Sequence, residues 1–383
     1  MARRKRRYSE KEERKALQSF DLTKAILPVI LGITVVAVLF FRQFDPHEFE
    51  KIDWSTGTLL FLLLALLFLL ARISFYALRL RILSDNSFSF LKCIQLIFIW
   101  EFSSAVSPTN VGGSAVALFI LSQEKIGAAK TTAIVIYTVV LDTLFFLICV
   151  PLWVLVFGAD VLGPGKQAFG GWEATLLSAY CIMFLYGLFF SYGLFVRPQS
   201  LKRLSLYLSR IKILKRFRKN LEQLGEDIVI TSKALLQQNT RYHISAFLTT
   251  VGAWSCRFLL IISLIMGITK SVPIRFESIL ELYARIQTMF VMMALTPTPG
   301  GAGLAELLFG SMLADYVPKG ISLVVASIWR LMAYYFFLLM GIIIIPQWLR
   351  TIIKERKAQR LREKQLQNRP PADSARTPGM TEK

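Results

Sequence analysis

Long apolar runs separated by short polar segments make up most of the chain. Six of these runs come close to or exceed the roughly 20 residues that a helix needs to cross a bilayer. They are predicted to be full membrane spans at residues 25–41, 58–80, 130–157, 173–196, 244–268 and 321–346. The first run follows a basic stretch ending at Lys24 and lacks a small-residue cleavage site, so we expect it to be retained as a helix.

Two further apolar runs, residues 90–121 and 278–313, are interrupted in the middle by proline and glycine. The second half of each run is too short to cross the bilayer as a straight helix, so each is predicted to form two half-helices that enter and return. Irregular backbone at membrane depth is tolerated only where protein or a water-filled cavity satisfies its polar groups. The pattern therefore predicts an all-α polytopic membrane protein with about six spans, two broken helical hairpins and an interior site.

The two breaks resemble each other. AVSPTNVGGSA, Ala105 to Ala115, and ALTPTPGGAG, Ala294 to Gly303, share a hydroxyl residue, Pro-Thr, a spacer and Gly-Gly. Asp142 and Arg330 follow the second glycines at the same sequence distance, so we expect the halves to be inverted repeats with a transport site near the midplane. Such a symmetry would also bring Asp142 and Arg330 together as a buried ion pair. A chance match of two short motifs is the alternative.

Composition and charge agree with a membrane protein. The chain is 54% hydrophobic, its mean hydropathy is +0.52 and its formal net charge is +20. The positive charge is concentrated in the N-terminus, the turn near Arg79, residues 197–219 and the tail, whereas residues 42–57 are acidic. This asymmetry predicts cytoplasmic termini, and no motif-bearing domain favours nucleic acid as the partner.

The same charge pattern divides the chain into regions. Residues 1–23 are predicted to be a basic cytoplasmic N-terminus, residues 24–346 a transmembrane domain, and residues 347–383 a basic, partly disordered cytoplasmic tail. Within the domain, residues 197–243 combine leucines at helical spacing with lysine and arginine, which is typical of an amphipathic helix on an anionic membrane surface. The scattered cysteines and two histidines indicate no disulfide framework or metal site, so no metal or cofactor is expected.

Charged residues inside apolar runs are candidate site residues because each is costly when it faces lipid. Arg257 and Arg330 are the preferred partners of an anion, since a guanidinium can bind phosphate through two donors. Arg72 and Glu281 lie near the ends of their runs and are expected to be interfacial. The alternative role of these charges is to form pairs that hold the helix bundle together. The eight residues are Arg72, Glu101, Asp142, Arg257, Glu281, Arg285, Glu306 and Arg330.

The glycines of the two breaks are a second candidate feature. Each Gly-Gly is predicted to begin the returning half-helix, where free backbone N–H groups would face the cavity and favour an anion such as phosphate. The alternative is that these glycines only permit tight turns and close helix packing. The residues are Gly112, Gly113, Gly300, Gly301 and Gly303.

The motifs SPTNVGG, TPTPGGAGLAE and SIWRLMAYYF resemble the lysylphosphatidylglycerol synthase transmembrane-region family of flippase-like membrane proteins. In the first motif Asn110 and Gly113 replace an arginine and an acidic residue common in that family, and Thr138 and Val139 replace a Glu-Arg pair. The resemblance implies binding roles for Pro108, Gly112, Gly113, Asp142, Pro297, Pro299, Gly300, Gly301, Gly303, Glu306 and Arg330. Arg257, a candidate because of its charge, completes the predicted site.

The resemblance implies a function in binding or moving a lipid, or a lipid-linked anionic head group, in the bacterial plasma membrane. Its partners would be membrane lipids. Residues 197–243 are too short to hold the soluble catalytic domain of the synthases, so enzymatic activity is not expected. Two alternatives remain open, an intramembrane transferase that uses a lipid-phosphate donor and a lipid-binding scaffold that transports nothing.

Overall fold

The computed structural model describes most of the chain from residue 54 to residue 367. The chain divides into two compact units, Met1–Gly341 and Ile342–Lys383, and the second unit holds the C-terminal part of the last helix. The described residues are 47, 50, 52, 54–107, 110–124, 126–158, 172–210, 218–269, 272–294, 301 and 304–367.

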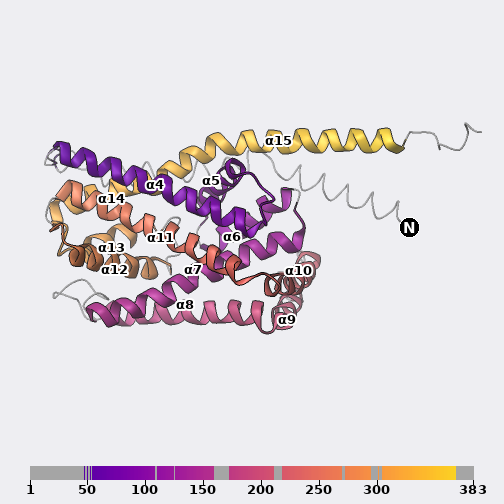
Figure 1. Cartoon of the computed structure of the whole chain (residues 1–383), viewed down its shortest axis with the longest axis horizontal. Helices are drawn as coiled ribbons and strands as arrows, with labels where there is room; N and C mark the ends of the chain where they lie inside the picture. Colours follow the sequence, from indigo (N-terminus) through magenta and orange to yellow (C-terminus); the bar gives the residue numbers. More distant parts are fainter. Residues whose placement is uncertain are drawn as a thin grey trace, which may run out of the picture. The chain divides into compact units, whose positions relative to one another are not determined.

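Every element in this described part is helical (Figure 1). The all-α fold predicted from the sequence is therefore confirmed. The elements are α4 Thr56–Leu83, α5 Phe90–Val106, α6 Asn110–Gln123, α7 Ala128–Phe157, α8 Trp172–Phe195, α9 Pro198–Leu208, α10 Arg218–Leu236, α11 Thr240–Thr269, α12 Phe276–Met293, α13 Leu304–Met312, α14 Lys319–Arg330, the π-helical turn η4 Leu331–Tyr335, and α15 Phe336–Gln367.

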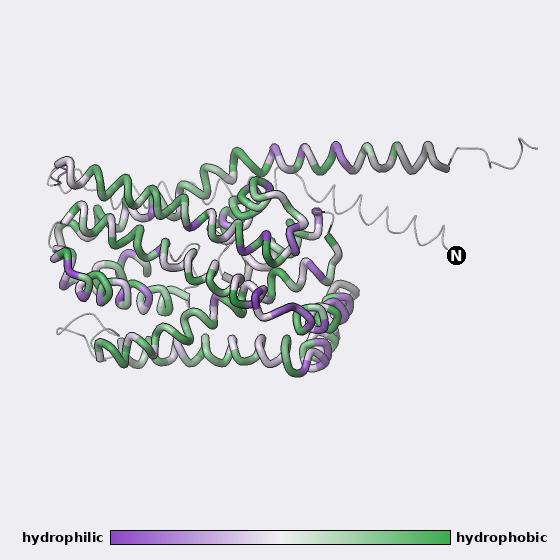
Figure 2. The backbone as a smooth tube through the Cα atoms, viewed as in Figure 1, coloured by the Kyte–Doolittle hydropathy of each residue, from purple (hydrophilic) through white to green (hydrophobic). Residues whose placement is uncertain are grey.

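Five helical stretches are long and apolar enough to cross a membrane: Thr56–Leu83, Ala128–Phe157, Leu176–Phe195, Thr240–Thr269 and Ile321–Glu355. They correspond to five of the six predicted spans, and Figure 2 shows them as mostly hydrophobic tubes. The remaining predicted span, residues 25–41, lies outside the described residues. A polytopic membrane protein is confirmed.

Both predicted hairpins are broken where proline and glycine interrupt the apolar pattern. Helix α5 ends at Val106, and Ser107 is extended with φ −75° and ψ 138° because it precedes Pro108. Helix α12 ends at Met293, and α13 does not begin until Leu304. Figure 1 places α5 and α6 toward one end of the bundle and α12 and α13 toward the other. This placement agrees with entry from opposite sides, while the repeat relationship stays a prediction.

Helix α11 is the most enclosed span, with 67% of its most apolar window buried, compared with 39% or less for the other four. It packs along α4, where glycine allows the backbones to approach closely. A Cβ on Gly267 would lie 2.6 Å from that of Phe61, and the Thr58 hydroxyl donates a hydrogen bond to the Gly267 carbonyl at 2.9 Å. Side chains of α11 therefore point into the bundle interior.

The basic segment after α8 forms the helices α9 and α10, in agreement with the predicted amphipathic region. Helix α9 buries Leu201 and exposes Tyr207, and α10 buries Ile228 and Leu235. The Thr231 hydroxyl donates to the Ala129 carbonyl at 2.6 Å, which fixes α10 against the start of α7. These helices cover one end of the bundle (Figure 1).

We expect Gly113→Ala to destabilise the first hairpin. An added Cβ would lie 2.1 Å from the Ser104 hydroxyl oxygen and 3.0 Å from the Ser104 Cα, so α5 and α6 would have to separate. Overpacking of this kind typically costs about 1–3 kcal/mol. The measurement is the free energy of unfolding in detergent. Gly127→Ala is the matched control because its φ is −65° and nothing lies within 4 Å of an added Cβ. Equal stabilities of the two variants would contradict the close contact.

Candidate functional site

A cavity of about 570 Å³ lies inside the first unit and is lined by residues of both hairpins. Ser107 and Ser114 line it from the first hairpin, and Met293 and Gly301 line it from the second. The remaining walls come from α4, α7, α8, α11, α14, η4 and the beginning of α15. The two interrupted segments, far apart in sequence, therefore contribute to one interior space.

Arg72 and Glu101 form a buried ion pair beside this cavity. The Arg72 Nη2 lies 2.7 Å from the Glu101 Oε2, and the arginine side chain is 0% exposed. Its guanidinium also lies 4.9 Å from the ring centre of Phe337 and 5.4 Å from that of Tyr76. The expectation that Arg72 is interfacial is wrong, because its span extends beyond the predicted end and α5 supplies a carboxylate at the same depth.

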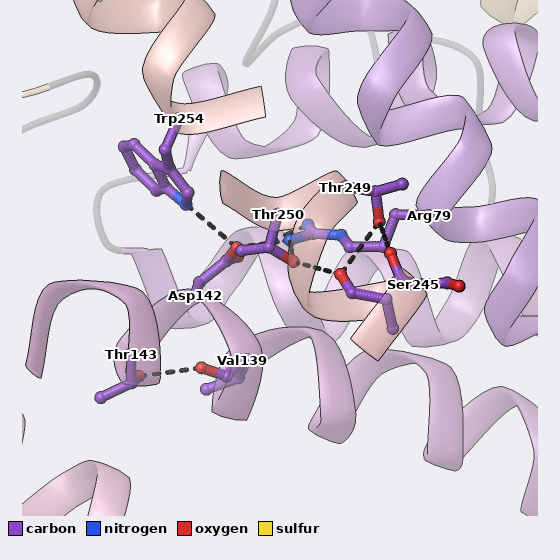
Figure 3. Close-up of polar contacts among 9 residues, drawn as sticks. Arg79, Val139, Asp142, Thr143, Ser245, Thr249, Thr250 and Trp254 are labelled. Atoms are coloured by element: carbon purple, nitrogen blue, oxygen red, sulfur yellow. Dashed lines mark hydrogen bonds and ion pairs between the residues drawn. The ribbon is translucent and has the colours of Figure 1, made fainter. Parts of the chain in front are cut away.

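A second network joins α4, α7 and α11 (Figure 3). The Arg79 Nη1 lies 2.5 Å from the Asp142 Oδ1 and 3.1 Å from the Thr250 hydroxyl oxygen, and the Trp254 indole donates to the same aspartate oxygen at 3.0 Å. Asp142 is thus held by an arginine and an indole. The predicted pairing of Asp142 with Arg330 is wrong, because matched sequence offsets determine depth in the bundle but not which helix becomes the neighbour.

Arg330 forms its ion pair within the second half of the chain. Its Nε lies 2.9 Å from the Glu306 Oε1, so the last residue of α14 is joined to the returning half-helix α13. The π-helical turn η4 follows directly, and there the Tyr334 hydroxyl donates to the Ala105 carbonyl at 3.0 Å. Single π-helical turns often occur at functional sites, and this one connects the second-half pair to the first hairpin.

Arg257 differs from the other cavity arginines because its charge is poorly compensated. Its Nη2 lies 3.9 Å from the Glu101 Oε2, the same oxygen that Arg72 holds at 2.7 Å. Its guanidinium lies 4.9 Å from the Trp254 ring centre and 5.3 Å from that of Phe290. Within the described residues it makes no hydrogen bond to protein, and it lines the cavity with 21% of its side chain exposed. Such a cation can bind an anionic ligand.

The structure brings several of the predicted site residues together. Asp142, Arg257, Gly301 and Arg330 line the cavity, and Glu306 is held there by its bond to Arg330. Gly301 has φ +68°, a backbone angle that favours glycine, so it also serves the turn. The other predicted positions that lie outside the described residues are Pro108, Pro297, Pro299, Gly300 and Gly303.

The remaining predicted glycines lie at the start of the returning helix α6. This helix begins at Asn110, so Gly112 and Gly113 both fall in its first turn. Gly113 faces Ser104 of α5, in agreement with the alternative role of close helix packing.

Two residues were not recognised as site residues from the sequence. The charge pattern places Arg79 in the basic turn, whereas the structure places it in the cavity wall, and Trp254 lines the cavity although it is not among the predicted site residues. The signal for Arg79 was available: Arg72, Tyr76 and Arg79 recur at intervals of four and three, which places them on one face of α4.

Comparison with known proteins identifies a family and a relative of this chain. The family described as "Lysylphosphatidylglycerol synthase TM region" matches residues 26–341. A "UPF0104 membrane protein" from Archaeoglobus fulgidus is 23% identical over 335 residues, which cover 83% of this chain and 95% of that protein. No solved structure matches the chain.

Proposed function

The chain belongs to the lysylphosphatidylglycerol synthase transmembrane-region family, and from that premise we propose that it binds an anionic lipid head group in its cavity and moves it across the membrane. The proposed location is the plasma membrane, with the termini, α9 and α10 on the cytoplasmic side. The basic residues of the segment that holds α9 and α10 support this orientation.

Arg257 is the observation that carries this proposal. Its guanidinium lines the cavity, and the carboxylate within ion-pair distance of it, Glu101, is already bonded to Arg72. A guanidinium can hold a phosphate or carboxylate group through two parallel hydrogen bonds. Because opposite charges attract more strongly in a medium of low dielectric than in water, an anionic group beside Arg257 would be favoured.

The position of α8 supports a lipid rather than a soluble anion. Ile182 and Tyr186 of this helix line the cavity, yet they are 53% and 38% exposed. Helix α8 is also the least enclosed of the five spans, with 22% of its apolar window buried. A lipid could therefore keep its acyl chains in the bilayer beside α8 while its head group reaches Arg257.

The decisive prediction concerns Arg257→Gln in liposomes that contain a fluorescent phosphatidylglycerol. We expect the wild-type protein to move the labelled lipid between leaflets and the variant to move it at least about tenfold more slowly, since a hydrogen bond to a charged group contributes about 1.5–3 kcal/mol. The measurement is protection of the label from a membrane-impermeant quencher. No metal or other cofactor is added.

Arg218→Gln is the matched control, because Arg218 forms an exposed pair with Glu222 on α10, outside the cavity lining. It should move lipid at the wild-type rate. Unchanged movement by Arg257→Gln would refute the proposed role of Arg257. A changed lipid mass would identify a transferase, and lipid retained without movement would identify a binding scaffold.

A further inference from the structure

Among the described residues, the charged side chains in and around the cavity form three close ion pairs and leave one additional cation. The pairs have nitrogen–oxygen distances of 2.7, 2.5 and 2.9 Å, and they are Arg72 with Glu101, Arg79 with Asp142, and Arg330 with Glu306. Arg257 is the seventh charged residue, and the two carboxylates near it, Glu101 at 3.9 Å and Asp142, are already paired with other arginines. In the part of the chain that the structure describes, these four arginines and three carboxylates sum to a net charge of +1.

The segments that join the hairpin helices add no charge to the cavity. The residues that join the hairpin helices, 107–109 and 294–303, contain no charged residue. Arg285 is a buried arginine of α12 in the second hairpin. Its guanidinium nitrogens lie 3.0 Å from carboxylate oxygens of Glu281 and Asp315, and it does not line the cavity. The single positive charge therefore belongs to Arg257.

A net charge in the interior of a membrane protein is unfavourable, because little water is available to solvate it. A ligand with one negative charge brings the cluster to neutrality. A zwitterionic ligand leaves the charge at +1, and a dianion changes it to −1. We infer that the cavity selects a monoanionic phosphodiester head group over zwitterionic phosphodiesters and dianionic phosphomonoesters, an inference that rests on the proposed lipid-binding function.

The geometry supports selection of a single charge. Arg79 is committed to Asp142 and Thr250, and Arg72 is fully buried against Glu101, so neither is placed to add a second cation to a ligand at Arg257. The guanidinium of Arg257 lies near Trp254, whose indole is fixed by its hydrogen bond to Asp142. Arg330 also lines the cavity but is bonded to Glu306 at 2.9 Å. Among the described residues, Arg257 is therefore the cation that is held in a fixed place to meet a ligand.

The test is competition among lipids with identical acyl chains for the purified full-length protein, read by native mass spectrometry. The lipids are phosphatidylglycerol, zwitterionic phosphatidylcholine and, at pH 8.5, the phosphomonoester phosphatidic acid. We expect phosphatidylglycerol to be retained about tenfold or more over each of the others, because the preference comes from one unscreened unit charge. Deacylated glycerophosphoglycerol, a soluble phosphodiester, should compete poorly.

Two substitutions separate charge from shape. Arg257→Gln makes the cluster neutral and should remove the preference for phosphatidylglycerol over phosphatidylcholine, whereas Arg257→Lys keeps the charge and should keep the preference. Equal loss in both variants would overturn the inference. If Arg257→Gln does not fold, the inference is tested by the lipid preferences of the wild type and of Arg257→Lys, both of which should favour phosphatidylglycerol.

Failure of this inference can be distinguished from failure of the proposed function. Retention of all three lipids to the same extent by the wild type would refute charge selection and leave lipid binding intact. No retained lipid, or full displacement by glycerophosphoglycerol, would refute the proposed function itself.

Discussion

Arg72→Ala is expected to cause the largest loss of stability, about 3–5 kcal/mol in the free energy of unfolding, because it leaves a buried charge without its partner. Arg72 is fully buried and holds Glu101 at 2.7 Å. The next cation, Arg257, is 3.9 Å from the same carboxylate, which is beyond hydrogen-bond distance. Unfolding by denaturant in detergent would measure the loss.

A double substitution tests the cause. Arg72→Met with Glu101→Gln removes both charges while keeping similar side-chain volumes, so it should recover part of the stability lost in Arg72→Ala. The exposed pair of Arg218 and Glu222 supplies the comparison, since surface ion pairs contribute only about 0–1 kcal/mol. Losses in the double variant as large as the sum of the single losses would show that the two side chains do not act as a pair.

Gly301→Ala is expected to reduce lipid movement to the background of protein-free liposomes. Gly301 lines the cavity with φ +68°, and an added Cβ would lie 3.2 Å from the Met293 Cε, which belongs to the other cavity-lining segment of the same hairpin. The methyl group would take up space in the cavity where we propose that the head group binds. The strain of the backbone itself costs only about 1–2 kcal/mol, so the protein should still insert and fold.

Gly158→Ala is the matched control for this prediction. Gly158 also has a positive φ, +77°, but nothing lies within 4 Å of an added Cβ and it does not line the cavity. Its substitution should lower stability at least as much while leaving lipid movement unchanged. Both variants would be compared at equal amounts of folded protein. If Gly301→Ala moved lipid normally, the glycine would be only a turn residue.

The sequence by itself located the spans and the breaks, because both depend on local features. A bilayer requires about 20 apolar residues with every backbone group bonded within the helix, so α4, α7, α8 and α11 were predictable. The break after α5 follows from Pro108, which pushes Ser107 into an extended conformation. Arg257 is a candidate site residue for an equally local reason, a charge within an apolar run.

Only the tertiary structure decided which charges pair. The equal sequence offsets of Asp142 and Arg330 suggested that these two residues pair. In the structure, α4 packs beside α7 and α11, so Asp142 pairs with Arg79, while Arg330 pairs with Glu306 of α13. Arg72 is buried because Glu101 and Phe337, distant in sequence, close around it. Hydropathy depends on each residue and its neighbours in the chain, whereas an ion pair depends on the relative rotation and depth of two helices. The rotation and depth of each helix are set by packing across the whole bundle. This packing pairs the other charges of the cavity and makes Arg257 the additional cation.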